Sequence, residues 1–204
     1  MGAAGRQARA GEFAKNHGVV MEVLSSFEDE PGTLVKEEVK AMEHIVVRGV
    51  AADKKQAKVT MLKVPDRPGI AAGIFKALAK ASINVDMIVL SVGAEGQLAD
   101  LSFTVPETDL HQTLGILEGV VPEVSSTGLS HDAKIAKVSV VGVGMRSHSG
   151  IAYRMFAALA DHGIDLQMIS TSEIKISVVI RRDQADEAVR ILHREFKLEQ
   201  ETPP

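Results

Sequence analysis

Two short segments, Gly69–Ala71 and Gly150–Ala152, combine residue types that suit the binding of a small anionic group. Both read Gly-Ile-Ala, and each stands where a helical pattern begins. The first N–H groups of a helix have no partner inside the helix and carry partial positive charge, which favours a carboxylate. Glycine at the head of such a helix lets a ligand approach the backbone closely. The two segments therefore predict two binding sites for a carboxylate of the kind that an amino acid carries.

Polar residues around the first segment extend this prediction to a whole amino acid. Asp66 can cap or orient the turn before the helix. Asn84–Asp86 open the next strand, where we expect them close to the same helix. Carbonyl groups and the Asp86 carboxylate would there receive an ammonium group. The same residues also fit a second interpretation, in which an ordinary turn precedes a helix and the polar residues only mark a strand edge.

The two segments belong to a repeat that covers most of the chain. PDRPGIAAGIFKALAKASINVDMI (65–88) returns as RSHSGIAYRMFAALADHGIDLQMI (146–169), and positions 69–88 and 150–169 share ten identical residues. Apolar periodicity predicts, in the first copy, strands at Lys58–Val64, Ile83–Val92, Leu98–Val105 and Glu123–Gly128 and helices at Ile70–Ala81 and Pro106–Leu117. In the second copy it predicts strands at Ile135–Val143, Ile164–Thr171 and Ile174–Arg182 and helices at Ile151–His162 and Asp183–Phe196. The order β-α-β-β-α-β is that of a ferredoxin-like α+β fold with antiparallel sheets.

The predicted strands do not divide evenly between the copies. The second copy lacks a convincing fourth strand, whereas His44–Val50 is strand-like and precedes the first copy, with a charged turn, AADKKQA, after it. We expect this early strand to complete the second sheet, so that the first copy is inserted in the second. The predicted domains are an inserted domain at 56–130, a split domain at 43–55 plus 131–204, and a leading segment at 1–42 with a helix at Arg6–His17 and a strand at Val19–Phe27.

Composition argues against several classes of protein. The chain contains no cysteine, which excludes disulfides, thiolate metal sites and a cysteine nucleophile. The histidines lack metal-ligand spacing and no Gly-rich loop carries a P-loop lysine, so we expect neither metal nor cofactor. A formal net charge of −4 with few aromatic rings argues against nucleic acid. Without an apolar run of about 18 residues or a signal peptide, we expect no membrane contact and a cytoplasmic location.

Five segments, in this order along the chain, resemble the paired ACT domains at the C-terminus of bacterial aspartate kinases. They are SSFEDEPGTLV (25–35), VPDRPGIAA (64–72), INVDMI (83–88), VGVGMRSHSGIA (141–152) and LQMISTSEIKISVVI (166–180). ARAGEFAKNHGV (8–19) resembles the end of the kinase domain, which assigns residues 1–42 to that end and a linker. In the family one ACT domain is inserted in the other, in agreement with the strand count.

The resemblance implies feedback control, in which lysine, threonine or both bind the ACT domains and inhibit the phosphorylation of aspartate. Effector contacts carried over motif by motif fall on Asp66, Gly69, Ile70, Ala71, Asn84, Val85 and Asp86 in the first copy and on Ile151, Ala152, Asp165, Leu166, Ser172 and Glu173 in the second. Two positions depart from the family. Asp165 stands where asparagine is usual and Leu90 where glutamine is usual, so both lose hydrogen-bonding groups that threonine would use.

The family's N-terminal nucleotide and aspartate motifs are absent from these 204 residues. We therefore expect no catalytic residues and no kinase activity in this chain alone, whether it is a separate regulatory subunit or a fragment. Expected partners are the effector, a second copy bound through the ACT domains, and a catalytic aspartate kinase subunit. One alternative is a free-standing tandem ACT sensor that regulates transcription or another enzyme, against which SSFEDEPGTLV argues. Another is a small ferredoxin-like hydrolase, for which no suitable Arg and Asn pair is present.

Overall fold

The structure, a computed structural model, describes residues 14, 19–23, 33–35, 47–93, 97–143 and 150–198. The chain divides into two units, Met1–Ile45 and Val46–Pro204. In the first unit β1 (Met21–Val23) and β2 (Thr33–Val35) form an antiparallel pair. β1 lies inside the strand predicted at Val19–Phe27, and the helix predicted at Arg6–His17 lies outside the described residues except for Ala14.

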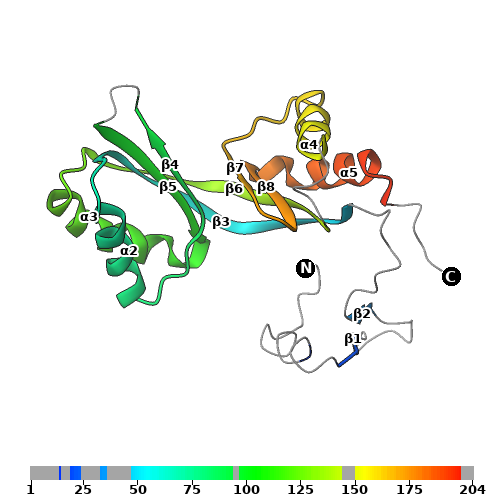
Figure 1. Cartoon of the computed structure of the whole chain (residues 1–204), viewed down its shortest axis with the longest axis horizontal. Coiled ribbons are helices and arrows are strands. Elements are labelled where there is room, and N and C mark those ends of the chain that lie inside the picture. The colour runs from blue at the N-terminus through cyan, green and yellow to red at the C-terminus, as the bar shows by residue number, and fades with distance from the viewer. Residues whose placement is uncertain are drawn as a thin grey trace. The chain divides into compact units, whose positions relative to one another are not determined.

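The second unit is built on one six-stranded antiparallel sheet with the strand order β4-β5-β3-β6-β8-β7. Its strands are β3 (Val47–Pro65), β4 (Asp86–Val92), β5 (Leu98–Pro106), β6 (Gly128–Gly142), β7 (Met168–Thr171) and β8 (Lys175–Arg181). The helices described in this unit are α2 (Ile70–Lys80), α3 (Leu110–Glu123), α4 (Ile151–Ala160) and α5 (Ala185–Glu195). Figure 1 shows α2 and α3 beside the half of the sheet that contains β4 and β5, and α4 and α5 beside the half that contains β7 and β8.

We call these two halves the first and the second module. The first module comprises α2, β4, β5 and α3, and the second comprises α4, β7, β8 and α5; β3 and β6 run through both. In the first module β3 pairs with β5 over Gln56–Pro65, and in the second module β6 pairs with β8 over Ile135–Val141. The α+β fold with two ferredoxin-like modules and antiparallel pairing is thus as predicted.

The continuity of β3 and β6 corrects two predictions. His44–Val50 and Lys58–Val64 were predicted as separate strands, but Val47–Pro65 is one strand, because Asp53 and Gln56 both stay paired with β6 while the exposed Lys54 and Lys55 between them form a bulge. The helix predicted at Pro106–Leu117 instead follows a 3₁₀ turn and runs to Glu123, and the last strand begins only at Gly128. Apolar residues continue at helical spacing through Val120, which explains the longer helix.

The early strand does complete the sheet of the second module. Val47 pairs with Gly142 and Ala52 pairs with Val138, both in β6. Val47 is also buried in the core of that module. The inserted order of the two modules follows from this pairing, whereas the domain limits at residues 42, 55 and 130 stay a prediction.

A pseudo-twofold axis relates the two modules. Gln56 of β3 pairs with Ile135 of β6, and the ladder then runs equally in both directions: Lys58 pairs with Asp132 on one side and Asp53 pairs with Lys137 on the other. The same three residues, Ala-Lys-Val, follow Gln56 and Ile135 in the chain. The axis therefore passes through the Gln56–Ile135 pair and exchanges β3 with β6.

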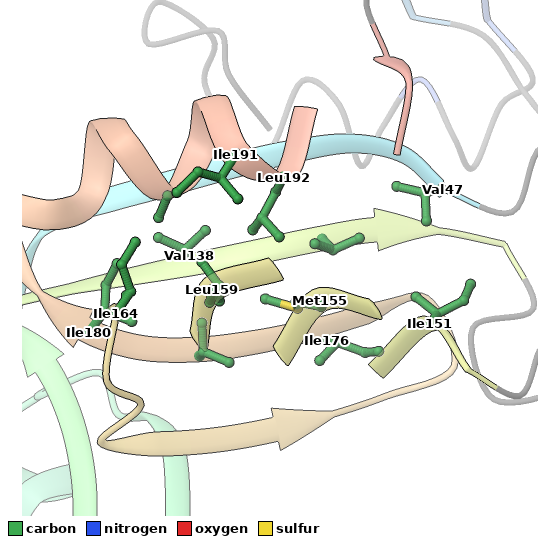
Figure 2. Close-up of a cluster of buried hydrophobic side chains, with 13 residues drawn as sticks. Val47, Val138, Ile151, Met155, Leu159, Ile164, Ile176, Ile180, Ile191 and Leu192 are labelled. Carbon is green, nitrogen blue, oxygen red and sulfur yellow. The ribbon is translucent and has the colours of Figure 1, made fainter. Parts of the chain in front are cut away.

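Each module has its own apolar core between its helices and its strands. In the first module the core includes Ile74 and Leu78 of α2, and Phe75 packs edge-to-face on Phe103 with 5.5 Å between ring centroids. Figure 2 shows the equivalent core of the second module, where Met155 and Leu159 of α4 face the strands.

A third, smaller cluster joins the modules on the faces that the helices do not cover. It contains Met87, Ile135, Met168 and Val179, with Val89 packed against it. Val179 lies between two residues of the helix-covered core, so strand alternation places it on the opposite face. Although β4 and β7 are the two end strands of the sheet, they contact each other here, because the sheet bends at the middle of β3 and β6.

Candidate functional site

Both predicted carboxylate sites are helix starts whose leading glycine has a left-handed backbone. Gly69 has φ 93° and ψ −20°, and Gly150 has φ 99° and ψ −13°. That conformation favours glycine, and no heavy atom of the described residues lies within 4 Å of a Cβ built on either one. Neither of the two described helices that follow has an acidic residue in its first turn or a side-chain cap. Their first N–H groups therefore keep the partial positive charge that suits an anion.

The start of α2 lies at the end of the sheet where β3 and β4 both finish. Pro65 ends β3 and pairs with Leu98, and the Asp66 N–H donates to the Gln97 carbonyl at 3.0 Å. Val92, the last residue of β4, pairs with Ala99 of β5, next to the Pro65–Leu98 pair. Of the predicted residues here, Ile70 is half-buried, whereas Asp66, Gly69 and Ala71 are exposed.

Asn84–Asp86 lie at the opposite end of the module. Asp86 pairs with Thr104, which also pairs with Lys58 in the middle of β3. Six residue steps of about 3.3 Å separate Asp86 from Val92, which places the two ends of β4 about 20 Å apart. Asn84–Asp86 thus lie close to the same helix, as expected, but at its C-terminal end, where the Ile83 N–H donates to the Leu78 carbonyl, and not beside its start at Gly69–Ala71. Because β4 runs parallel to β3, α2 must carry the chain back along the sheet before β4 begins.

The predicted residues of the second module divide in the same way. Ser172 and Glu173 follow β7 in a tight turn, where the Ser172 N–H donates to the Lys175 carbonyl at 2.8 Å. This turn adjoins the end of β6, since the Gly142 N–H donates to the Ile174 carbonyl, and so belongs to the end of the sheet where α4 starts. Asp165 and Leu166 precede β7 at the other end. The start of α4 is more enclosed than the start of α2, because Ile151 is 6% exposed and Ala152 is half-buried.

Asp86 is already bonded to the other module. Lys137 Nζ of β6 forms an ion pair with Asp86 Oδ2, and the Met87 N–H donates to Asp86 Oδ1 at 2.9 Å. Partial burial raises the pKa of Asp86, but the Lys137 and Met87 hydrogen bonds and the charges of Lys137 and Lys175 outweigh burial and hold that pKa below its ordinary value. Asp86 is therefore ionised at neutral pH, with much of its charge balanced inside the chain.

Lys58 makes the equivalent contact in the opposite direction. Its Nζ donates to Gln167 Oε1 at 2.8 Å, and Gln167 stands just before β7 as Asp86 stands at the start of β4. The hydroxyl pairs two residues further along β3 and β6 repeat as well: Thr60 lies 2.8 Å from Ser102, and Ser139 lies 2.8 Å from Ser177. The junction of the modules is thus built from pairs of equivalent polar contacts around the pseudo-twofold axis.

Sequence reasoning missed these junction residues. Lys58, Lys137 and Gln167 were not among the predicted site residues, although the repeated Ala-Lys-Val offered a signal. A lysine that recurs at the same place in two repeated strand segments is one that the sheet presents twice on the same face.

The described part of the chain contains neither of two further features, a cluster of metal-ligating side chains and a membrane-spanning helix. No group of three or more His, Asp or Glu side chains is placed there to hold a metal ion. None of the helices in that part is long and apolar enough to span a membrane.

Two family models, each described as an ACT domain, match residues 58–121 and 138–196. The chain is 46% identical over 194 residues to an aspartate kinase of Stutzerimonas stutzeri, which covers 95% of this chain and 47% of that protein. It is 47% identical over 196 residues to an aspartokinase of Helicobacter pylori, covering 94% and 48%. The chain thus spans about half the length of the curated relatives it matches.

Solved structures match the two modules over almost the whole of their own length. A structure of aspartokinase alpha and beta subunits is 46% identical with a TM-score of 0.69, and the match covers 74% of this chain and 99% of that one. The ligand-free regulatory subunit of aspartate kinase from Thermus thermophilus is 40% identical with a TM-score of 0.70, covering 74% and 99%.

Proposed function

The chain belongs to the aspartate kinase family, of which it forms the regulatory part with two ACT domains, and we propose that it binds an amino acid and mediates feedback inhibition of the kinase. The observation that supports this most is the pair of helix starts at Gly69 and Gly150. Both lack acidic residues and side-chain caps, and both stand at equivalent places in the repeated module. A carboxylate is one of the anionic groups that such helix starts bind.

Lysine, threonine or both are the effectors that we propose. Their shared carboxylate would bind at a helix start, and the shared ammonium group would bind to carbonyl groups and acidic or amide side chains such as Asn84. In the second module Ser172 and Glu173 lie at the same end of the sheet as Ile151 and supply polar groups to that site.

A second copy of the chain would complete the first site. In the described residues β4 pairs on one side only, with β5, and the strand carries exposed Ile88, Leu90 and Val92 at alternating positions, on one of its faces. If two β4 edges pair antiparallel, the start of one strand lies beside the end of the other. Asn84–Asp86 of one copy would then approach the helix start at Gly69 of the other. We therefore propose a homodimer in which each effector contacts both copies.

The catalytic subunit of aspartate kinase is the proposed partner in inhibition. Effector binding would act on it by favouring one arrangement of the ACT domains over another. The chain by itself is proposed to have no kinase activity, which an ATP- and aspartate-dependent hydroxamate assay can check.

Titration calorimetry of the purified chain with L-lysine and L-threonine tests the proposed function. We expect saturable binding of at least one of them, and none of the D-enantiomers at the same concentrations. Leu90→Gln and Asp165→Asn, which install the residues usual in the family, are expected to tighten threonine binding. Absence of binding by every amino acid of the aspartate family would overturn the proposal.

A further inference from the structure

The carboxylate of Asp86 is already bound to a cation of the chain itself. Lys137 Nζ forms an ion pair with Asp86 Oδ2, while Asp86 Oδ1 accepts the Met87 N–H at 2.9 Å. The Asp86 side chain is nevertheless 42% exposed, whereas that of Lys137 is 17% exposed. A ligand can therefore reach this carboxylate from solvent, but it meets an ammonium group that is bound there.

Lys137 carries the same chemical group as the ammonium end of an amino acid. Two ammonium groups that approach one carboxylate repel each other. An amino acid must therefore either displace Lys137 from Asp86 or bind beside its positive charge. A site that has to break an internal contact first binds its ligand more weakly, in proportion to the fraction of molecules in which the contact is broken.

Two other contacts between the modules leave Asp86 alone. Lys58, the equivalent of Lys137, donates to the neutral amide oxygen of Gln167 at 2.8 Å. Arg182 Nη1 donates to Glu107 Oε1 at 3.1 Å. The first is a lysine contact at the equivalent position and the second is an ion pair between modules, so both serve as internal controls for the role of Lys137.

We propose that Lys137 competes with the ammonium group of the effector for Asp86 and thereby sets the affinity of the first module's site, an inference that rests on the proposed function. Lys137 lies in the part of β6 that pairs with β8, opposite Val179. An effector that takes Asp86 therefore releases a contact between the two modules. Because coupling is reciprocal, loss of that contact strengthens effector binding.

Titration calorimetry of the full chain with L-threonine and with L-lysine, each alone, tests the competition. Lys137→Gln removes the charge but keeps a group that can hydrogen-bond to Asp86, and Lys137→Met removes both. We expect each variant to bind the amino acid that binds the unchanged chain about threefold to tenfold more tightly at low salt. Added salt should reduce this gain, because it screens the charges. Either variant suffices if the other does not fold.

Three further variants separate charge at Asp86 from other effects. Lys137→Arg keeps the positive charge and should abolish the gain. Lys58→Gln removes the equivalent lysine, and Glu107→Gln removes the other ion pair between modules. Neither acts on the Asp86 carboxylate, so both should leave the affinity within about twofold of that of the unchanged chain.

Thermal unfolding gives a second measurement of the same competition. Lys137→Gln should lower the melting temperature of the free chain, because the ion pair is lost. A saturating amino acid should narrow the difference in melting temperature between this variant and the unchanged chain, since the bound ligand has already taken Asp86 from Lys137. If Lys137 had only a structural role, the difference would stay the same.

The outcomes distinguish this proposal from the proposed function. Equal or weaker binding by both Lys137→Gln and Lys137→Met, while the unchanged chain binds, would overturn the competition and leave the proposed function standing. A gain of the same size in Lys58→Gln would also overturn it, because the effect would then come from a general loosening of the junction. Absence of binding in the unchanged chain and in every variant would overturn both proposals.

Discussion

In each module a lysine side chain contacts the other module at the equivalent position, but the two lysines bind chemically different groups. Lys137 reaches from the second module to a carboxylate, Asp86, whereas Lys58 reaches from the first module to a neutral amide, that of Gln167. The two contacts share their geometry because the repeated strands are arranged alike. The residue that receives the lysine differs: Asp86 at the start of β4 is charged, whereas Gln167 just before β7 is not. The junction therefore has an ion pair, Lys137–Asp86, on one side and a hydrogen bond from a lysine to a neutral amide, Lys58–Gln167, on the other.

The cores differ in a similar way. The first module buries Phe103 against Phe75, whereas the equivalent strand position in the second module is Val178, which is also fully buried. The two modules thus reach complete burial with different side-chain volumes, since cores tolerate exchange of apolar residues when the total volume is filled.

The largest expected effect is loss of the second module's edge strand. Deletion of Met1–Ala52 removes the half of β3 that pairs with Val138–Gly142 and removes Val47 from the core. We expect the amides of α4 and α5 to lose hydrogen-exchange protection while those of α2 and α3 keep most of theirs. Deletion of Met1–Ile45 is the control and should leave both modules protected. Equal protection in the two truncations would show that this strand does not stabilise the second module.

Matched cavities test whether the modules unfold together. Leu78→Ala and Leu159→Ala each remove a fully buried leucine at equivalent places in α2 and α4, and each should cost about 2–5 kcal/mol. Because β3 and β6 run through both modules, we expect one shared transition in denaturant, shifted by either variant. Two separate transitions, each shifted by only one variant, would show that the modules unfold independently.

The smallest expected effect concerns the ionic side of the junction. The folded-state pKa of Asp86 is lowered, so its stabilisation is present above the unfolded pKa of about 3.9 and is lost as pH falls through the lower folded value. Asp86→Asn should remove that part of the acid dependence. Gln167→Asp should add a second such dependence and, at neutral pH, at most about 1 kcal/mol, since the contact is partly exposed. If stability depends on acid pH in the same way in the unchanged chain, in Asp86→Asn and in Gln167→Asp, the ion pair of Asp86 does not contribute to that dependence.

The sequence by itself determined the repeat and the helix that opens each of its two copies. Helices predicted at Ile70–Ala81 and Ile151–His162 are observed at Ile70–Lys80 and Ile151–Ala160. A helix bonds within one segment, so apolar spacing and a leading glycine suffice to place it. The prediction that an early strand completes the second sheet also came from counting strands, because unpaired edges must be covered.

Only the tertiary structure decided where the predicted site residues lie relative to one another. Asn84–Asp86 and Gly69–Ala71 flank one helix in the sequence but lie at opposite ends of the first module, because pairing with β5 fixes the direction of β4. The partners of Asp86, Gln167 and Glu107 come from the other module, far away in the chain. Such contacts depend on how the sheet bends and on which faces meet, and no local periodicity encodes either.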